Sequence, residues 1–77
     1  MTFTDAVKIA NQNRISPSNY RINGNGAAEA DTVSYLDYVP NGFRYHITDR
    51  GSIVFNRVYK TEDEACKAFL NDFGVEI

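Results

Sequence analysis

"TVSYLDYVPNGFRYHITDRGSIVFNRVY", residues 32–59, is the stretch that decides the fold of this chain. It contains three runs rich in β-branched and aromatic residues, and apolar and polar residues alternate along each run with a period of two. Two turn-forming triplets, PNG and DRG, separate the runs. The pattern therefore predicts three strands of an antiparallel meander, at residues 32–39, 43–48 and 52–59.

The two triplets predict how the meander turns. Asn41-Gly42 favours a type I′ turn, which needs a positive φ at both central positions. Asp49-Arg50-Gly51 favours a three-residue loop in which the glycine takes the left-handed conformation. Because both connections are short, consecutive strands are expected to be neighbours in the sheet.

The alternation divides the strand residues between two faces of the sheet. The apolar face collects Leu36, Tyr38, Phe43, Tyr45, Ile47, Ile53 and Phe55. The mixed face, a name kept below, collects Val33, Tyr35, Asp37, Arg44, His46, Val54, Asn56 and Val58. Across neighbouring strands of the mixed face, Asp37 is expected to meet Arg44 or His46.

A helix is predicted at residues 3–14, where apolar residues recur at helical spacing and Thr2 with Asp5 can form a capping box. Residues 20–22 are expected to form a short extended piece. NGNGAAEAD, residues 23–31, is glycine-rich, but no adequate strand precedes it and no Gly-Lys-Ser/Thr follows it. It is therefore interpreted as a flexible connector and not as a nucleotide site.

A second helix is predicted at residues 61–73, with Thr61 and Glu64 as its capping box and Gly74 at its C-terminal end. Its apolar stripe consists of Ala65, Cys66, Phe69, Leu70 and Phe73. The stripe needs an apolar surface to cover. The sequence thus predicts a single α+β domain over residues 1–77: an N-terminal helix, a three-stranded antiparallel β-meander, and a C-terminal helix packed on the sheet.

Composition narrows the classes of function. The chain has 77 residues, a net charge of −2 and one cysteine, so it cannot form an internal disulfide. No apolar run is long enough to span a membrane and the N-terminus lacks the features of a signal peptide, so a cytoplasmic protein is expected. Nucleic acid is not the expected partner, because proteins that grip phosphates usually carry a basic balance.

No convergent set of catalytic or metal-ligating residues can be found. One histidine and one cysteine far apart do not make a metal site, Cys66 belongs to an apolar helix stripe, and no cofactor motif is present. His46 has two interpretations. It is a general acid or base oriented by Asp37 or Asp49, or it is a half-exposed strand residue that pairs with Tyr35 or Asp37. The second is favoured, because no other histidine or lysine accompanies it.

Two stretches, FRYHITDRG (43–51) and NRVYKTEDEACKAFLNDF (56–73), resemble small bacterial immunity proteins of contact-dependent growth inhibition and other polymorphic toxin systems. YRINGNG upstream resembles a Y-x-I-x-G pattern that precedes this region in them. The chain differs in having Phe43 where tryptophan is common and Asp49 where glutamate is. The matching residues are Phe43, Tyr45, Arg50, Gly51, Thr61, Glu64, Ala65, Phe69 and Leu70.

The resemblance implies a protein without catalytic activity that binds a cognate toxin domain, often a nuclease, and covers its active site. A basic nuclease is the expected partner, and no membrane or small molecule is expected to take part. The expected toxin-binding residues are Glu29, Asp31, Tyr35, Asp37, His46 and Asn56.

Two alternatives stay open. The helix at residues 3–14 could cover the mixed face, which would leave the acidic outer side of helix 61–73 as the interface. The protein could also be a small non-catalytic adaptor or regulatory domain that binds another protein or RNA.

Overall fold

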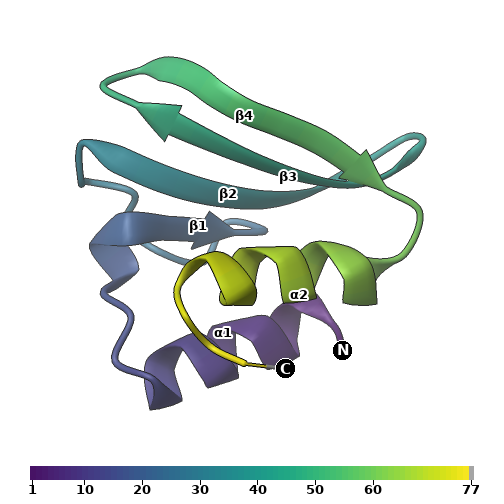
Figure 1. Cartoon of the computed structure of the whole chain (residues 1–77), viewed down its shortest axis with the longest axis horizontal. Coiled ribbons are helices and arrows are strands. Elements are labelled where there is room, and N and C mark those ends of the chain that lie inside the picture. The colour runs from purple at the N-terminus through teal and green to yellow at the C-terminus, as the bar shows by residue number, and fades with distance from the viewer. Residues whose placement is uncertain (77) are drawn as a thin grey trace.

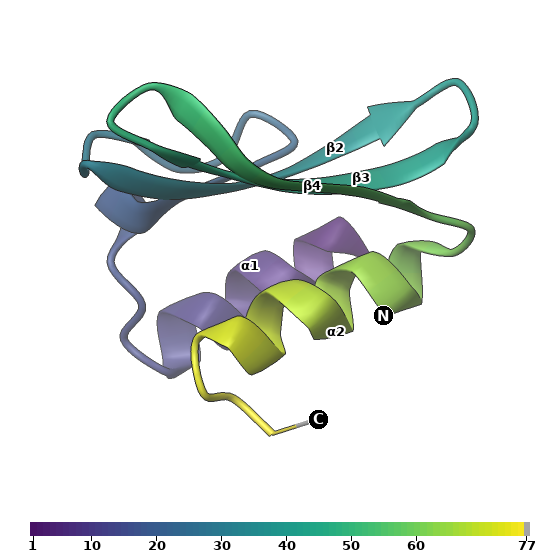
Figure 2. The same cartoon turned by 45° about the horizontal axis from the view of Figure 1, so that its top comes forward.

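Two helices lie side by side on one face of a four-stranded sheet in the computed structural model, which describes residues 1–76 (Figures 1 and 2). The strands follow the order β1-β2-β3-β4. The α+β class predicted from the sequence is confirmed. The elements are α1 (Phe3–Gln12), a 3-10 turn (Pro17–Asn19), β1 (Tyr20–Ile22), β2 (Thr32–Val39), β3 (Gly42–Asp49), β4 (Ser52–Tyr59) and α2 (Glu62–Asp72).

The sheet has one strand more than predicted. Strand β1 pairs parallel to β2, with Tyr20 beside Ser34 and Ile22 beside Leu36, so the predicted all-antiparallel meander is wrong in this respect. Tyr20 and Ile22 are buried while Arg21 between them is exposed. A strand of three residues is too short for this alternation to stand out in the sequence.

The glycine-rich segment 23–31 between β1 and β2 is held by hydrogen bonds. Ala27 N donates to Pro17 O (2.8 Å), and Ala30 N donates to Ser18 O (2.9 Å). Gly26 passes so close to Tyr20 that a Cβ atom at position 26 would lie 2.2 Å from the Tyr20 carbonyl oxygen. The segment is therefore anchored to β1 and the 3-10 turn.

The first hairpin turns one residue earlier than predicted. Val39 pairs with Gly42, so Pro40 and Asn41 form the turn and Asn41 does not take a positive φ. Proline favours this arrangement, because its fixed φ suits the first central position of a common turn. The pairing of β2 with β3 is therefore shifted from the predicted pairing by an even number of residues. Each side chain consequently stays on the face of the sheet that was predicted for it.

The second hairpin has a two-residue turn, and the predicted three-residue loop is wrong. Asp49 pairs with Ser52, and the two residues between them, Arg50 and Gly51, have φ values of 52° and 85°. Such a pair of positive φ values matches the twist of a hairpin. Arg50 N also donates to Asp31 O (2.7 Å), which helps to hold the unusual conformation of the arginine.

A β-bulge changes the faces at the start of β4. Ile47 pairs with Phe55 but Thr48 pairs with Ile53, which leaves Val54 as the extra residue. Ile53 therefore lies on the mixed face opposite Thr48, and its predicted place on the apolar face is wrong. The prediction for Phe55 is confirmed, since its ring lies 5.4 Å from the Tyr45 ring.

The core lies between the helices and the apolar face of the first three strands. Ala6 and Ala10 of α1 and Ala65 of α2 are fully buried, and these small side chains allow the two helices to lie close together. Phe69 packs edge-on against both Tyr20 and Tyr45, with ring centroids 6.0 and 6.1 Å apart. Full burial of one such side chain contributes about 1.5–3 kcal/mol to folding.

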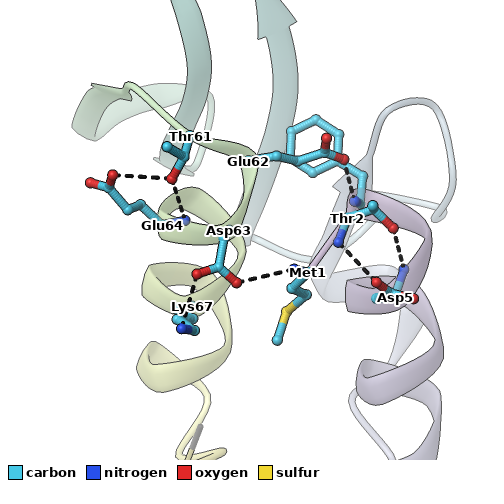
Figure 3. Close-up of polar contacts among 9 residues, drawn as sticks. Met1, Thr2, Asp5, Thr61, Glu62, Asp63, Glu64 and Lys67 are labelled. Atoms are coloured by element: carbon cyan, nitrogen blue, oxygen red, sulfur yellow. Dashed lines mark hydrogen bonds and ion pairs between the residues drawn. The ribbon is translucent and has the colours of Figure 1, made fainter.

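Both helices begin at capped N-termini (Figure 3). Asp5 N donates to the Thr2 hydroxyl and Thr2 N donates to the Asp5 carboxylate, so the predicted capping box of α1 is present. At α2, Glu64 N donates to the Thr61 hydroxyl, but the Glu64 carboxylate accepts from that hydroxyl and not from a backbone amide. Helix α1 ends at Gln12, two residues before the predicted limit.

Candidate functional site

The mixed face is the side of the sheet that the helices leave uncovered (Figure 2). Helices α1 and α2 both pack against the opposite, apolar face, because Phe3 of α1 contacts the rings of Tyr38 and Phe43 there. The alternative in which α1 covers the mixed face is therefore wrong. The candidate site is built on this open surface.

One row of side chains crosses all four strands of the mixed face. Arg21 of β1 pairs with Tyr35 of β2, Tyr35 pairs with His46 of β3, and His46 pairs with Asn56 of β4. Directly opposed residues in neighbouring strands place their side chains on the same face and within contact distance. A second row, Asp37–Arg44–Val58, lies beside the first.

His46 is enclosed between an aromatic ring and a cation. Its imidazole stacks on the Tyr35 ring, with centroids 4.5 Å apart and an interplanar angle of 4°. Arg44 Nε lies 3.1 Å from His46 Nδ1, and a terminal nitrogen of the same guanidinium lies 3.3 Å from Nε2. Tyr35, His46 and Arg44 are called the stacked cluster below.

The stacked cluster holds its histidine neutral near pH 7. Burial lowers the pKa of His46 below its ordinary value of 6.5, and the neighbouring Arg44 charge lowers the pKa further. The Asp37 carboxylate, 3.8 Å from Nδ1, acts in the opposite direction and is the weaker influence. With 7% of its surface exposed, His46 is a buried residue and not the half-exposed one that was expected.

The geometry makes His46 a poor general base. Arg44 Nε donates to His46 Nδ1, so the lone pair that a general base would use is already engaged and the hydrogen of the neutral ring lies on Nε2. Asp49, the second predicted orienting residue, accepts a hydrogen bond from the Thr32 hydroxyl (2.9 Å) at the end of the sheet. The cluster is better suited to present a rigid surface than to transfer protons.

Four of the six predicted contact residues come together on the mixed face: Tyr35, Asp37, His46 and Asn56. The other two do not join them. Asp31 lies at the end of the sheet, where its carbonyl accepts from the Arg50 amide, and Glu29 is exposed in the connecting segment. The sequence placed Arg44 on this face as an expected partner of Asp37 but did not predict its contact with His46. It had not included Arg21, because β1 was not recognised as a strand.

The acidic side of α2, the alternative interface, has its carboxylates in use within the fold (Figure 3). Glu62 accepts from the Phe3 amide (2.6 Å). It also accepts from the Tyr38 hydroxyl (3.1 Å). Asp63 accepts from the N-terminal amine (3.1 Å) and pairs with Lys67 (2.9 Å). These contacts join α2 to α1 and β2, which gives the acids a structural role.

Strand β4 adds an apolar surface that sequence reasoning missed. Every residue from Ser52 to Val58 is exposed, including Ile53 (57%), Val54 (62%), Phe55 (39%) and Val58 (40%). The prediction that helix 61–73 packs on the sheet is confirmed, but the helices leave most of β4 exposed. The lengths of the elements carried this signal, since two helices of 10 and 11 residues cover the apolar side of β1, β2 and β3 and reach β4 only near Tyr59.

Other kinds of site receive no support from the described residues. Within residues 1–76, no three histidine, cysteine or carboxylate side chains gather in a way that could hold a metal ion. In that same part of the chain, no helix has the length and apolar character needed to cross a membrane. Cys66 is fully buried, and burial together with the nearby Glu62 carboxylate raises the pKa of its thiol to about 12. A thiol in this state is unreactive.

Comparison of the chain with protein-family models, with curated proteins and with solved structures found no match.

Proposed function

We propose that this protein is an immunity protein that binds a bacterial toxin domain stoichiometrically and blocks it without catalysis. The observation that supports the proposal is the uncovered mixed face with its stacked cluster. An open sheet face that carries a tyrosine in a fixed orientation offers a large contact area at little cost in conformational entropy. Tyr35 is held by its stack on His46, so it needs no ordering when a partner binds.

The charges on this face refine the expected partner. The face carries two arginines, Arg21 and Arg44, and a single carboxylate, Asp37, so the face itself is not acidic. Carboxylates gather instead at the end of the sheet where β2 begins, at Asp31 and Asp49, with Glu29 nearby in the chain. This distribution favours a nuclease whose basic cleft meets the acidic end while a less basic rim contacts the face.

The test is co-expression with a toxin domain encoded by a neighbouring reading frame. We expect wild type to bind the toxin domain and to protect growth. The variant Tyr35→Ala with Asp37→Lys removes an aromatic contact and reverses a charge, so it should lose protection. Asn56→Lys places a cation at the exposed end of the same row, opposite His46, and it should weaken binding as well.

The matched control is Lys8→Ala with Gln12→Ala, because both residues are exposed on α1, on the opposite side of the molecule. Circular dichroism of each purified variant separates lost binding from lost fold. Full protection by the folded mixed-face variants would exclude the face as the interface. Failure of wild type to bind or protect would overturn the immunity proposal itself.

RNA binding is a second candidate function, because two arginines flank an aromatic ring on an open sheet. Single-stranded nucleic acids stack bases on such rings and bind cations through their phosphates. This candidate predicts binding to a fluorescent single-stranded RNA that weakens steeply with salt and is reduced by Arg44→Ala. Unchanged anisotropy at low salt would exclude it.

A further inference from the structure

Strand β4 ends the sheet with an unpaired edge. Among the described residues its only strand neighbour is β3, so alternate backbone amides and carbonyls along its other side lack a strand partner. The strand is eight residues long and contains no proline. An edge of this kind is a template for a further strand.

The side chains of β4 add apolar surface on both sides of that edge. Ile53 and Val58 are exposed on the mixed face, and Phe55 is exposed on the helix side. Arg57 is the only charged residue of the strand, and its guanidinium lies 4.8 Å from the centre of the Tyr59 ring. Apolar residues on both sides of an edge distinguish it from edges that are protected by inward-facing charges.

The bulge at Val54 is the one feature that opposes pairing, since bulges disturb regular edges. It lies in the first half of the strand. From Phe55 to Tyr59 the pairing with β3 is regular, so this half presents a regular edge.

We infer that a second copy of this chain pairs with this edge, β4 against β4 in antiparallel orientation about a two-fold axis, to form one continuous sheet through the dimer. In an antiparallel pair, residues that point their N–H and C=O groups at the partner strand lie directly opposite each other. The two-fold axis between two copies of β4 must therefore pass between two copies of the same residue. An axis at Arg57 would oppose two arginines, which is unfavourable. An axis at Asn56 opposes the two asparagine amides and places each Phe55 beside Arg57 of the second copy.

This register makes the strand complementary to itself. Phe55 and Arg57 lie on the same face of the sheet, opposite Ile47 and Tyr45, so the aromatic ring and the guanidinium meet directly. An arginine over an aromatic ring is a favourable contact. In this register Val58 of each copy lies opposite the bulged residue Val54 of the other, so the regular pairing spans residues 55–57. The dimer goes beyond the proposed function and leaves both mixed faces open on one surface.

The experiment is sedimentation equilibrium of the purified protein from low micromolar to submillimolar concentration. The expected mass of wild type rises from that of one chain, 8.7 kDa, towards twice that value. Phe55→Lys places a cation opposite Arg57 of the second copy and should remain monomeric. Phe55→Glu removes the same ring but places an anion there, so it should still dimerise.

A charge exchange tests the register. Phe55→Lys combined with Arg57→Glu restores opposite charges across the axis and should recover the dimer that Phe55→Lys loses. Circular dichroism confirms that each variant is folded, which is expected because both positions are exposed. A wild type that stays at the monomer mass at every concentration overturns the inference. Equal behaviour of Phe55→Lys and Phe55→Glu overturns the proposed register. Neither result depends on a toxin, so the proposed function is tested separately.

Discussion

His46 illustrates how neighbours on one face tune a single side chain. Because its pKa in the folded protein is lowered below 6.5, the unfolded chain binds more protons in the window just below pH 6.5. Stability therefore decreases as pH falls through that window and levels off below the folded-state pKa. The NMR titration of this one histidine is expected to give a midpoint below 6.5. Arg44→Ala should raise the midpoint, because it removes a positive charge, and Asp37→Asn should lower it, because it removes a negative charge. If Arg44→Ala leaves the midpoint unchanged, the proposed arrangement of the stacked cluster is contradicted.

Tyr45 joins the core of the sheet to the end of α2. Its side chain is buried, and its hydroxyl donates to the Asp72 carboxylate at 2.5 Å. Burial and the neighbouring carboxylate both raise the pKa of the phenol, so it stays protonated. Tyr45→Phe should lower the free energy of unfolding by about 1 kcal/mol, measured by urea denaturation. Tyr59→Phe is the control, since no hydrogen bond is seen for that hydroxyl within residues 1–76, and an equal loss would contradict the assignment.

For single residues, the sequence predicted correctly which side chains share a face of the sheet. It did not predict how deeply those side chains are buried. Alternation along three strands was enough to place Tyr35, Asp37, His46 and Asn56 on one face. The burial of His46 depends on where the Tyr35 ring and the Arg44 guanidinium lie, and rotamers of this kind are decided by packing. A pattern of polar and apolar letters does not contain that information.

Among the elements, α2 is joined to both α1 and β2 by one side chain, Glu62. Its carboxylate accepts hydrogen bonds from Phe3 of α1 and from Tyr38 of β2. Glu62→Ala leaves both donors without this partner and should lower stability by about 1–3 kcal/mol in thermal or urea unfolding. Glu64→Ala is the matched control, because Glu64 contacts only Thr61 of its own cap. A loss no larger than that of the control would show that Glu62 does not join the elements.

Turns were the least predictable elements. Asn41-Gly42 is a strong hairpin dipeptide, yet Pro40 takes the first turn position and moves Gly42 into β3. Gly42 has its own reason to be glycine, since a Cβ there would lie 2.3 Å from the Tyr59 carbonyl oxygen. That requirement comes from β4, a strand that is distant in the chain. Local turn preferences could not reveal it.

For the whole molecule, Cys66 is a natural reporter of unfolding. It is fully buried at the centre of the core, and the pKa of its thiol is raised to about 12. A thiol reagent such as DTNB should therefore label the native protein only when the whole fold opens. Labelling across a urea series is expected to follow the loss of circular dichroism. Labelling that precedes this loss would indicate that α2 detaches on its own.

The overall class and the layer arrangement followed from periodicity, because 32–59 alternates with a period of two and 62–72 with a helical period. The position of α1 did not follow. At Ala6 and Ala10 the apolar stripe of α1 carries small side chains. Their spacing predicts a helix but does not indicate which element the helix packs against. The partner is α2 together with the apolar face, and this choice leaves the mixed face open.

The packing of α1 on α2 also has a consequence for the order of events on the ribosome. Helix α1 is synthesised before α2, yet Phe3, Ala6 and Ala10 share a core with residues 65–70, which follow the whole sheet in the chain. An isolated helix of this length is marginal in water, so α1 has no stable form while it waits. The segment must therefore remain open until α2 has left the exit tunnel, and residues 3–72 then fold as one unit.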